Sequence, residues 1–154
     1  MNLLARTPDT PAEADRCAAD PVSGIAPFDR RVIAVGAVVF AVLLAVATRY
    51  GFHRDELYFI ECARHLQASY VDQPVLTPLL AWVSLKLFGV SLLGLRMWPA
   101  LAAWATVIIA GLTAREFGGG RRAQLLAAVA TATTPVVLGG DHLFGPTAFD
   151  LLAW

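Results

Sequence analysis

The chain has 154 residues, of which 57% are hydrophobic and 16% are charged. Soluble domains are usually about 45–50% apolar and about 25% charged, so the composition disfavours a soluble globular protein and excludes disorder for most of the chain. The formal net charge of +0 excludes a general basic surface, and we expect no nucleic-acid partner.

Residues 1–29 are predicted to form a disordered cytoplasmic tail. Prolines and acidic residues recur along this segment without apolar periodicity, and the Leu3–Leu4 pair is too short for a secretory signal. The two cysteines, Cys17 and Cys62, are too few for a disulfide scaffold or a zinc site. We expect them to lie on opposite sides of a membrane, unbridged, as small apolar fillers.

Three long uncharged runs predict helices that cross a membrane. A crossing helix needs about 20 apolar residues, and about 17 suffice. Spans are therefore expected near residues 32–50, 95–116 and 121–140, and a fourth begins at 146–154. The glycines at 118–120 permit a tight reversal, which predicts an antiparallel hairpin between the second and third spans.

The arginines orient these spans. Arginine and lysine favour the cytoplasmic side. If the chain crosses the membrane twice between residues 31 and 115, five arginines lie on the same side as the N-terminus. They are Arg30, Arg31, Arg115, Arg121 and Arg122. Residues 51–92 then form an external loop. The predicted fold is all-α, a polytopic transmembrane bundle in the cell membrane with external juxtamembrane helices.

The external loop is predicted to contain two helices at the membrane surface. Phe59, Cys62, Ala63, Leu66 and Tyr70 share one face of a short amphipathic helix, which would lie apolar face down on the membrane. Glu61, Arg64 and His65 fall on the other face, and Asp72-Gln73-Pro74 ends the helix. Residues 75–90, with Pro78 and Lys86, are interpreted as an interfacial helix; the alternative is a further span, which would move Arg121 and Arg122 outside.

Four polar residues follow the first span directly: His53, Arg54, Asp55 and Glu56. An unpaired carboxylate near hydrocarbon has a raised pKa, which suits a general base, and Arg54 could hold a phosphate. The alternative is an ordinary charged membrane boundary with both carboxylates solvated. These residues and His142 could ligate a divalent cation, but they lack a metal-binding spacing.

Asp150 lies inside an apolar run near the end of the chain. An acidic residue at membrane depth costs about 2.5 to 3.5 kcal/mol on insertion scales, so it usually faces a cavity or a partner. The alternative is a helix-start residue at the interface. Asp141 and His142 are expected in a short external turn, where a plain polar turn is the competing interpretation.

The order of these features resembles a known enzyme family. The segments that carry the resemblance are His53-Arg54-Asp55-Glu56-Leu57-Tyr58-Phe59, residues 70–79, the helix start at residues 95–101, residues 114–119, and Thr147-Ala148-Phe149-Asp150-Leu151-Leu152-Ala153-Trp154. Together they are similar to the first part of the family-39 glycosyltransferases, the protein O-mannosyltransferase-like membrane enzymes of the GT-C fold, which include aminoarabinose transferases. The resemblance covers residues 30–154 and implies a truncated transferase domain, which we expect to lack part of the donor cavity and to be inactive alone.

The resemblance implies transfer of a sugar from a polyprenyl-phosphate donor to a hydroxyl of a lipid, glycan or protein acceptor. It places the family's acidic motif at Asp55 and Glu56, where the acceptor is deprotonated, and a second acidic position at Asp150. Gln73-Pro74 stands where many members have His-Pro. Arg54 or Arg96 could stabilise the lipid phosphate that leaves, and a single displacement would invert the anomeric centre.

Two other functions stay open at this point. A transporter or channel subunit would use Asp55, Asp150 and His142 to line an ion path, but it predicts polar residues along the middle of the spans. A non-catalytic membrane assembly protein would depend on helix packing alone, and Asp55→Asn would then change nothing.

Overall fold

The computed structural model describes residues 26–71 and 73–154, and every regular element in them is an α-helix. The predicted all-α class is therefore confirmed. Of the tail predicted at residues 1–29, residues 1–25 lie outside the described residues, as do Cys17 and Asp72, whereas residues 26–29 are bonded to Arg115 and Gln124. The helices are α2 (Arg31–Val46), α3 (Arg54–Arg64), α4 (Leu76–Phe88), α5 (Leu92–Glu116), α6 (Arg121–Ala132), α7 (Pro135–Gly140) and α8 (Pro146–Ala153).

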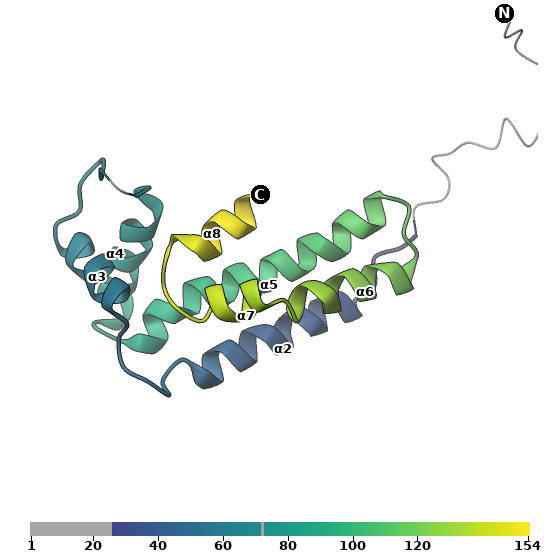
Figure 1. Cartoon of the computed structure of the whole chain (residues 1–154), viewed down its shortest axis with the longest axis horizontal. Coiled ribbons are helices and arrows are strands. Elements are labelled where there is room, and N and C mark those ends of the chain that lie inside the picture. The colour runs from purple at the N-terminus through teal and green to yellow at the C-terminus, as the bar shows by residue number, and fades with distance from the viewer. Residues whose placement is uncertain (1–25, 72) are drawn as a thin grey trace, which may run out of the picture.

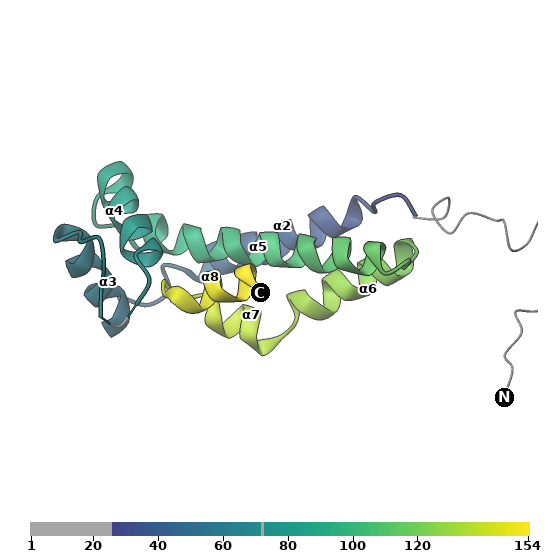
Figure 2. The same cartoon turned by 90° about the horizontal axis from the view of Figure 1, so that it is seen from above.

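Helices α2, α5 and α6 lie side by side along the long axis of the molecule, and α5 runs antiparallel to the other two (Figure 1). Helices α3 and α4 cover one end of this bundle, and α8 turns back beside α5 (Figure 2). The predicted hairpin between α5 and α6 is confirmed. Its turn contains Gly118 at φ 81°, a backbone conformation that glycine adopts without strain.

Small residues bring α2 and α5 close together. A Cβ atom on Gly36 would lie 2.8 Å from Cδ1 of Trp104, and one on Gly111 would lie 2.7 Å from Cγ1 of Val32. Neither position has room for a larger side chain. The core between α2, α5 and α6 contains Val39, Ala103, Val107 and Ala128 among others, and such small apolar residues allow close helix packing.

The outer surface of the bundle is apolar between its ends. Exposed residues on α2, α6 and α7 include Ile33, Val38, Val42, Val46, Leu126, Val129, Val136 and Leu138. Among the described residues, one helix, α5, is both long enough and apolar enough to cross a membrane. Helices α2 and α4 are apolar but shorter. At about 1.5 Å per residue, the 16 residues of α2 span about 24 Å, less than the ~30 Å of a bilayer core.

The stretch expected as a third span, residues 121–140, is not one continuous helix. It divides into α6 and α7 at Thr133 and Thr134, because Pro135 lacks the N–H that a continuous helix would need. Threonine hydroxyls take up the backbone groups freed at the break. Oγ1 of Thr134 donates to the carbonyl of Thr131 at 2.8 Å and accepts from the amide of Val137 at 3.4 Å. The first expected span also ends early, at Val46 instead of residue 50.

The predicted amphipathic helix after residue 53 is α3, but its apolar face lies against protein. Phe59, Ile60 and Ala63 form a second core with Ala81 of α4 and residues of α5 and the α7–α8 connection. The helix ends at Arg64 and does not reach Tyr70, whose hydroxyl donates to the carbonyl of Cys62 at 3.0 Å. The apolar face of α3 is therefore covered by protein and does not lie on a membrane surface, contrary to the prediction from the sequence.

Candidate active site at one end of the bundle

The start of α3 places its two acidic residues in different environments. Nδ1 of His53 accepts from the amide of Asp55 at 3.3 Å, and Oε2 of Glu56 accepts from the amide of His53 at 2.9 Å. This reciprocal cap fixes the first turn of the helix. Successive residues on a helix point about 100° apart. Asp55 is exposed as a result, whereas Glu56 is fully buried.

Glu56 is a fully bonded, ionised carboxylate. Its Oε1 accepts from Nε of Arg96 at 2.8 Å and from the amide of Phe144 at 3.0 Å, and its Oε2 accepts from Nη2 of Arg96 at 2.7 Å. Burial alone would raise the pKa of Glu56, but the bonds from Arg96, Phe144 and His53 outweigh it and hold the pKa below its ordinary value. Glu56 is therefore poorly suited to accept a proton from a substrate.

Four of the five N–H groups of Arg96 are bonded within the protein, and its side chain is 1% exposed, so it is poorly placed to bind a substrate phosphate. Besides Glu56, its guanidinium donates to the carbonyl of Ala47 through Nη1 and to the carbonyl of Gly51 through Nη2 at 3.0 Å. It also lies 4.5 Å from the centre of the Tyr50 ring, at cation–π distance. The Glu56–Arg96 ion pair thus joins the end of α2, the start of α3, α5 and the α7–α8 connection.

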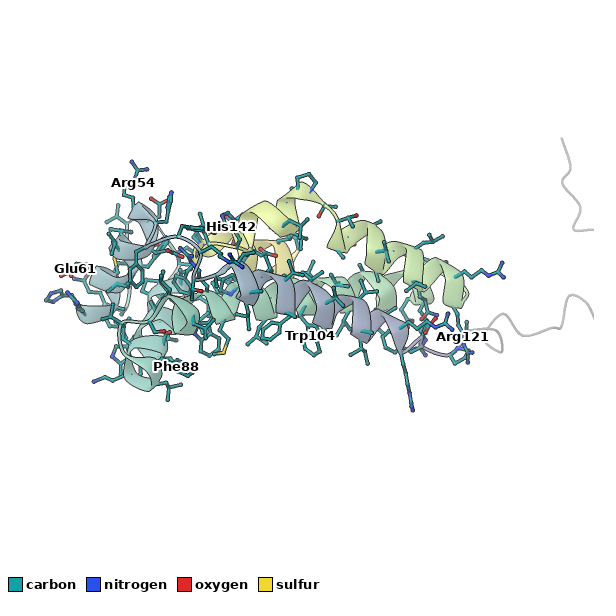
Figure 3. The ribbon with its side chains drawn as sticks, turned by 90° about the horizontal axis from the view of Figure 1, so that it is seen from below. Arg54, Glu61, Phe88, Trp104, Arg121 and His142 are labelled. Atoms are coloured by element: carbon teal, nitrogen blue, oxygen red, sulfur yellow. The ribbon has the colours of Figure 1, made fainter. Side chains whose placement is uncertain are left out.

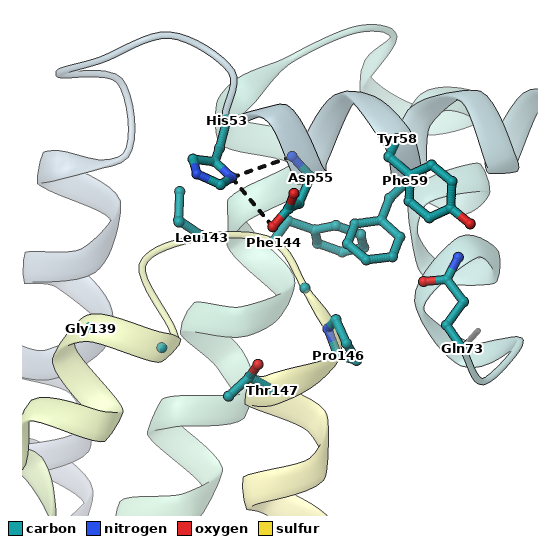
Figure 4. Close-up of a pocket in the computed structure, with 12 residues that line it drawn as sticks. His53, Asp55, Tyr58, Phe59, Gln73, Gly139, Leu143, Phe144, Pro146 and Thr147 are labelled. Atoms are coloured by element: carbon teal, nitrogen blue, oxygen red, sulfur yellow. Dashed lines mark hydrogen bonds and ion pairs between the residues drawn. The ribbon is translucent and has the colours of Figure 1, made fainter.

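A pocket of about 470 Å³ lies beside this ion pair (Figure 4). Three segments far apart in the sequence meet around it: α3, residue 73 and residues 139–147. The lining residues are His53, Asp55, Tyr58, Phe59, Gln73, Gly139, Gly140, Leu143, Phe144, Gly145, Pro146 and Thr147. The pocket therefore has one carboxylate, one imidazole and several neutral hydrogen-bonding groups.

Asp55 is the carboxylate of the pocket. Its side chain is 58% exposed, lies 3.7 Å from Nδ1 of His53 and 3.4 Å from Nε of Arg54. An accessible carboxylate beside an imidazole can take a proton from a bound molecule and pass it to water. The α7–α8 connection lines the same pocket as Asp55, so a molecule bound in the pocket would contact both.

The other predicted site residues are divided between the pocket and its surroundings. His53 lines the pocket, whereas the side chain of Arg54 is 91% exposed and points away into solvent. His142 is half-buried outside the pocket, with its ring edge-on to Tyr50 at 5.8 Å. Asp150 is exposed on α8 and does not line the pocket.

Sequence reasoning missed the neutral residues of the pocket. Tyr58 lies three residues after Asp55, so the helical period places both on one face of α3 and could have indicated it. Thr147 lies on the first turn of α8 and carried no comparable signal. For Gln73 the sequence predicts only a place in the turn that ends the helix.

Asp141 is a second buried carboxylate near this end, in the turn after α7. It is 1% exposed, and neither carboxylate oxygen has a hydrogen-bond partner in the described part of the chain. Burial without a partner raises the pKa of Asp141 to about 7. Glu56 and Asp141 are therefore similarly buried, but the pKa of Glu56 is lowered and the pKa of Asp141 is raised.

The described residues hold no group of three or more histidine, cysteine, aspartate or glutamate side chains arranged to bind a metal ion. In the pocket, the side chains of this kind are His53 and Asp55. The described geometry adds no support for the divalent-cation site that the sequence left open.

A protein-family model described as dolichyl-phosphate-mannose-protein mannosyltransferase matches residues 72–154, more than half of the chain. The chain belongs to this glycosyltransferase family. No curated protein and no solved structure matches it. The mannosyltransferase-family match covers α4 to α8, including Arg96 and one side of the pocket, while α3 with Asp55 and Glu56 precedes it.

Proposed function

We propose that this chain carries the acceptor-activating site of a membrane glycosyltransferase. It transfers a sugar from a polyprenyl-phosphate donor to a hydroxyl of a lipid, glycan or protein at the outer face of the cell membrane. One observation carries the proposal: Asp55 lines a pocket at the end of an apolar bundle, while its neighbour Glu56 is held by Arg96. The family match supports the reaction class.

The proposed step is a single displacement with Asp55 as the general base. Asp55 takes the proton of the acceptor hydroxyl, and the acceptor oxygen forms a bond to the anomeric carbon of the sugar. The bond from that carbon to the donor phosphate oxygen breaks, and the polyprenyl phosphate leaves with the electron pair. Attack opposite the leaving group inverts the anomeric centre.

The remaining polar residues are proposed to assist. His53 orients Asp55 through the cap of α3, and Arg54, whose exposed side chain lies 3.4 Å from Asp55, would turn toward the pocket to bind a phosphate. Arg96 positions Asp55 indirectly, because it fixes Glu56 in the same turn. Contacts of His142 and Asp150 with the donor stay predictions, since neither lines the pocket.

The proposed topology is multi-pass with a cytoplasmic N-terminus. The basic ends of α2, α5 and α6 lie at the end of the bundle away from the pocket (Figure 3), and we assign this end to the cytoplasmic side because arginines next to spans favour it. The exposed apolar residues along the bundle support its insertion. A transporter is less well supported, because the polar groups gather at helix ends and the exposed middle of α2 is apolar.

The test is sugar transfer in membranes that contain the full chain. Radiolabelled polyprenyl-phosphate mannose is the donor, and transfer to endogenous acceptors is compared between wild type, Asp55→Asn and Glu61→Gln. Removal of a general base costs about 10²- to 10⁴-fold, so Asp55→Asn should lose at least about 100-fold. Glu61 is an exposed carboxylate on the same helix outside the pocket, and its variant should keep wild-type activity. Wild-type transfer by Asp55→Asn would contradict the assignment.

A further inference from the structure

The end of the bundle opposite the pocket also buries a polar side chain. Gln124 on α6 is fully buried, and its Oε1 accepts from the amide of Asp29 at 2.9 Å. Its Nε2 donates to the carbonyls of Pro27 at 3.3 Å and Gly119 at 3.4 Å. Gln124 therefore fastens the segment before α2 to the turn before α6.

This attachment brings Arg30 and Arg31, before and at the start of α2, beside Arg121 and Arg122 at the start of α6. Nε of Arg115 adds a bond to the carbonyl of Ala26 at 3.1 Å, which fixes the same segment to the end of α5. The segment then continues into Arg30 and Arg31, beside the two arginines that begin α6. Two adjoining hollows of about 280 Å³ and about 530 Å³ lie between them. Their lining is Pro27, Phe28, Asp29, Arg30, Arg31, Arg121, Arg122 and Leu125.

The hollows are strongly positive. Within residues 26–71 and 73–154, no carboxylate forms an ion pair with Arg30, Arg31, Arg121 or Arg122. Asp29 lines both hollows, and its Oδ1 accepts from the amide of Arg31 at 2.9 Å, so its single charge offsets only part of theirs. The N-terminus of α6 points to the same place without a side-chain cap, and helix N-termini favour anions.

We propose that this arginine cluster (Arg30, Arg31, Arg121 and Arg122) binds the phosphate headgroup of an anionic phospholipid in the membrane leaflet at this end. Guanidinium groups match phosphate geometry with paired donors, and basic pockets between helices on the cytoplasmic side bind such headgroups. Phe28 and Leu125 line the hollows with apolar surface that suits the first carbons of the acyl chains. The site rests on the membrane insertion proposed above and not on the transfer reaction.

The test measures the affinity of the full chain for phosphatidylglycerol in phosphatidylcholine nanodiscs, by native mass spectrometry of retained lipid. Arg121→Gln with Arg122→Gln should lower the affinity by roughly tenfold or more, since each arginine near a lipid surface contributes appreciably. Arg49→Gln with Arg64→Gln removes the same charge at the other end of the bundle and should change the affinity by less than about twofold.

Charge and geometry are separated by Arg121→Lys with Arg122→Lys. This variant keeps the net charge but loses the paired donors, and a formed site predicts that it also binds phosphatidylglycerol several-fold more weakly. Full affinity in the lysine variant, or equal losses in the glutamine variant and its control, would overturn the site in favour of diffuse attraction. Because the measurement does not use catalysis, failure of Asp55→Asn to lose transfer would refute the proposed function and leave this result standing.

Discussion

The two ends of the helix bundle hold their connecting segments with different chemistry. At the pocket end, the Glu56–Arg96 ion pair bonds to backbone groups of Ala47, Gly51, His53 and Phe144. At the other end, the neutral amide of Gln124 holds the residues before α2. A charge pair is costly to bury, and it offsets that cost only when its geometry is good and further hydrogen bonds satisfy its remaining donors and acceptors. The charged pair lies beside Asp55, the proposed general base, whereas Gln124 attaches the segment before α2 together with the bond from Arg115 to the carbonyl of Ala26.

The largest effect should follow from breaking the ion pair. Arg96→Met leaves Glu56 as a buried charge with only two backbone donors, which should cost about 3–5 kcal/mol of the free energy of unfolding. The double variant Glu56→Met/Arg96→Met should lose less than the two single losses added together, because no charge is left unpaired. Unfolding by SDS in mixed micelles measures both.

The control for this comparison is Arg64→Gln, which breaks an exposed ion pair with Glu61 at 3.3 Å. Exposed pairs contribute less than about 1 kcal/mol, so this variant should unfold like wild type. If Arg96→Met were no more damaging than Arg64→Gln, the ion pair would not be what holds the pocket end together.

The sequence predicted the elements of both ends better than the contacts between them. The uncharged runs indicated α2, α5 and the α5–α6 hairpin, because apolar length and glycine position are local signals. Pro135 inside the third run could have predicted the division into α6 and α7, since proline interrupts a helix wherever it falls in the interior.

The pairing of Glu56 with Arg96 could not be predicted in the same way. The two residues are 40 positions apart, and their contact depends on how α3 folds over the end of α5. The sequence did place Asp55 and Glu56 at the mouth of the bundle. It could not say which of them faces the pocket, because that depends on the rotation of α3, which His53 sets by capping it.

A smaller loss is expected at the other end. Gln124→Leu removes three hydrogen bonds and leaves backbone groups of Pro27 and Asp29 without their partner, at a cost of about 2 kcal/mol. Hydrogen exchange should speed up at residues 26–31, and phosphatidylglycerol affinity should fall although no arginine is changed. Gln67→Leu, at an exposed glutamine, is the matched control and should alter neither. Unchanged exchange in Gln124→Leu would mean that Gln124 does not attach this segment.

The last effect depends on pH and concerns Asp141, the buried carboxylate without a hydrogen-bond partner among the described residues. The pKa of Asp141 is raised from 3.8 to about 7, so the folded protein binds a proton that the unfolded chain has lost between those values. Stability from this group is complete below about pH 4 and declines as the pH rises towards 7. Asp141→Asn cannot ionise, and it should therefore be more stable than wild type at pH 8, yet equal to it near pH 4. Glu116→Gln, at an exposed carboxylate, should show no such difference between the two pH values. A wild-type protein that unfolds at the same temperature as Asp141→Asn at pH 8 would show that Asp141 has a hydrogen-bonding partner after all, and the two buried carboxylates at the pocket end would then be alike.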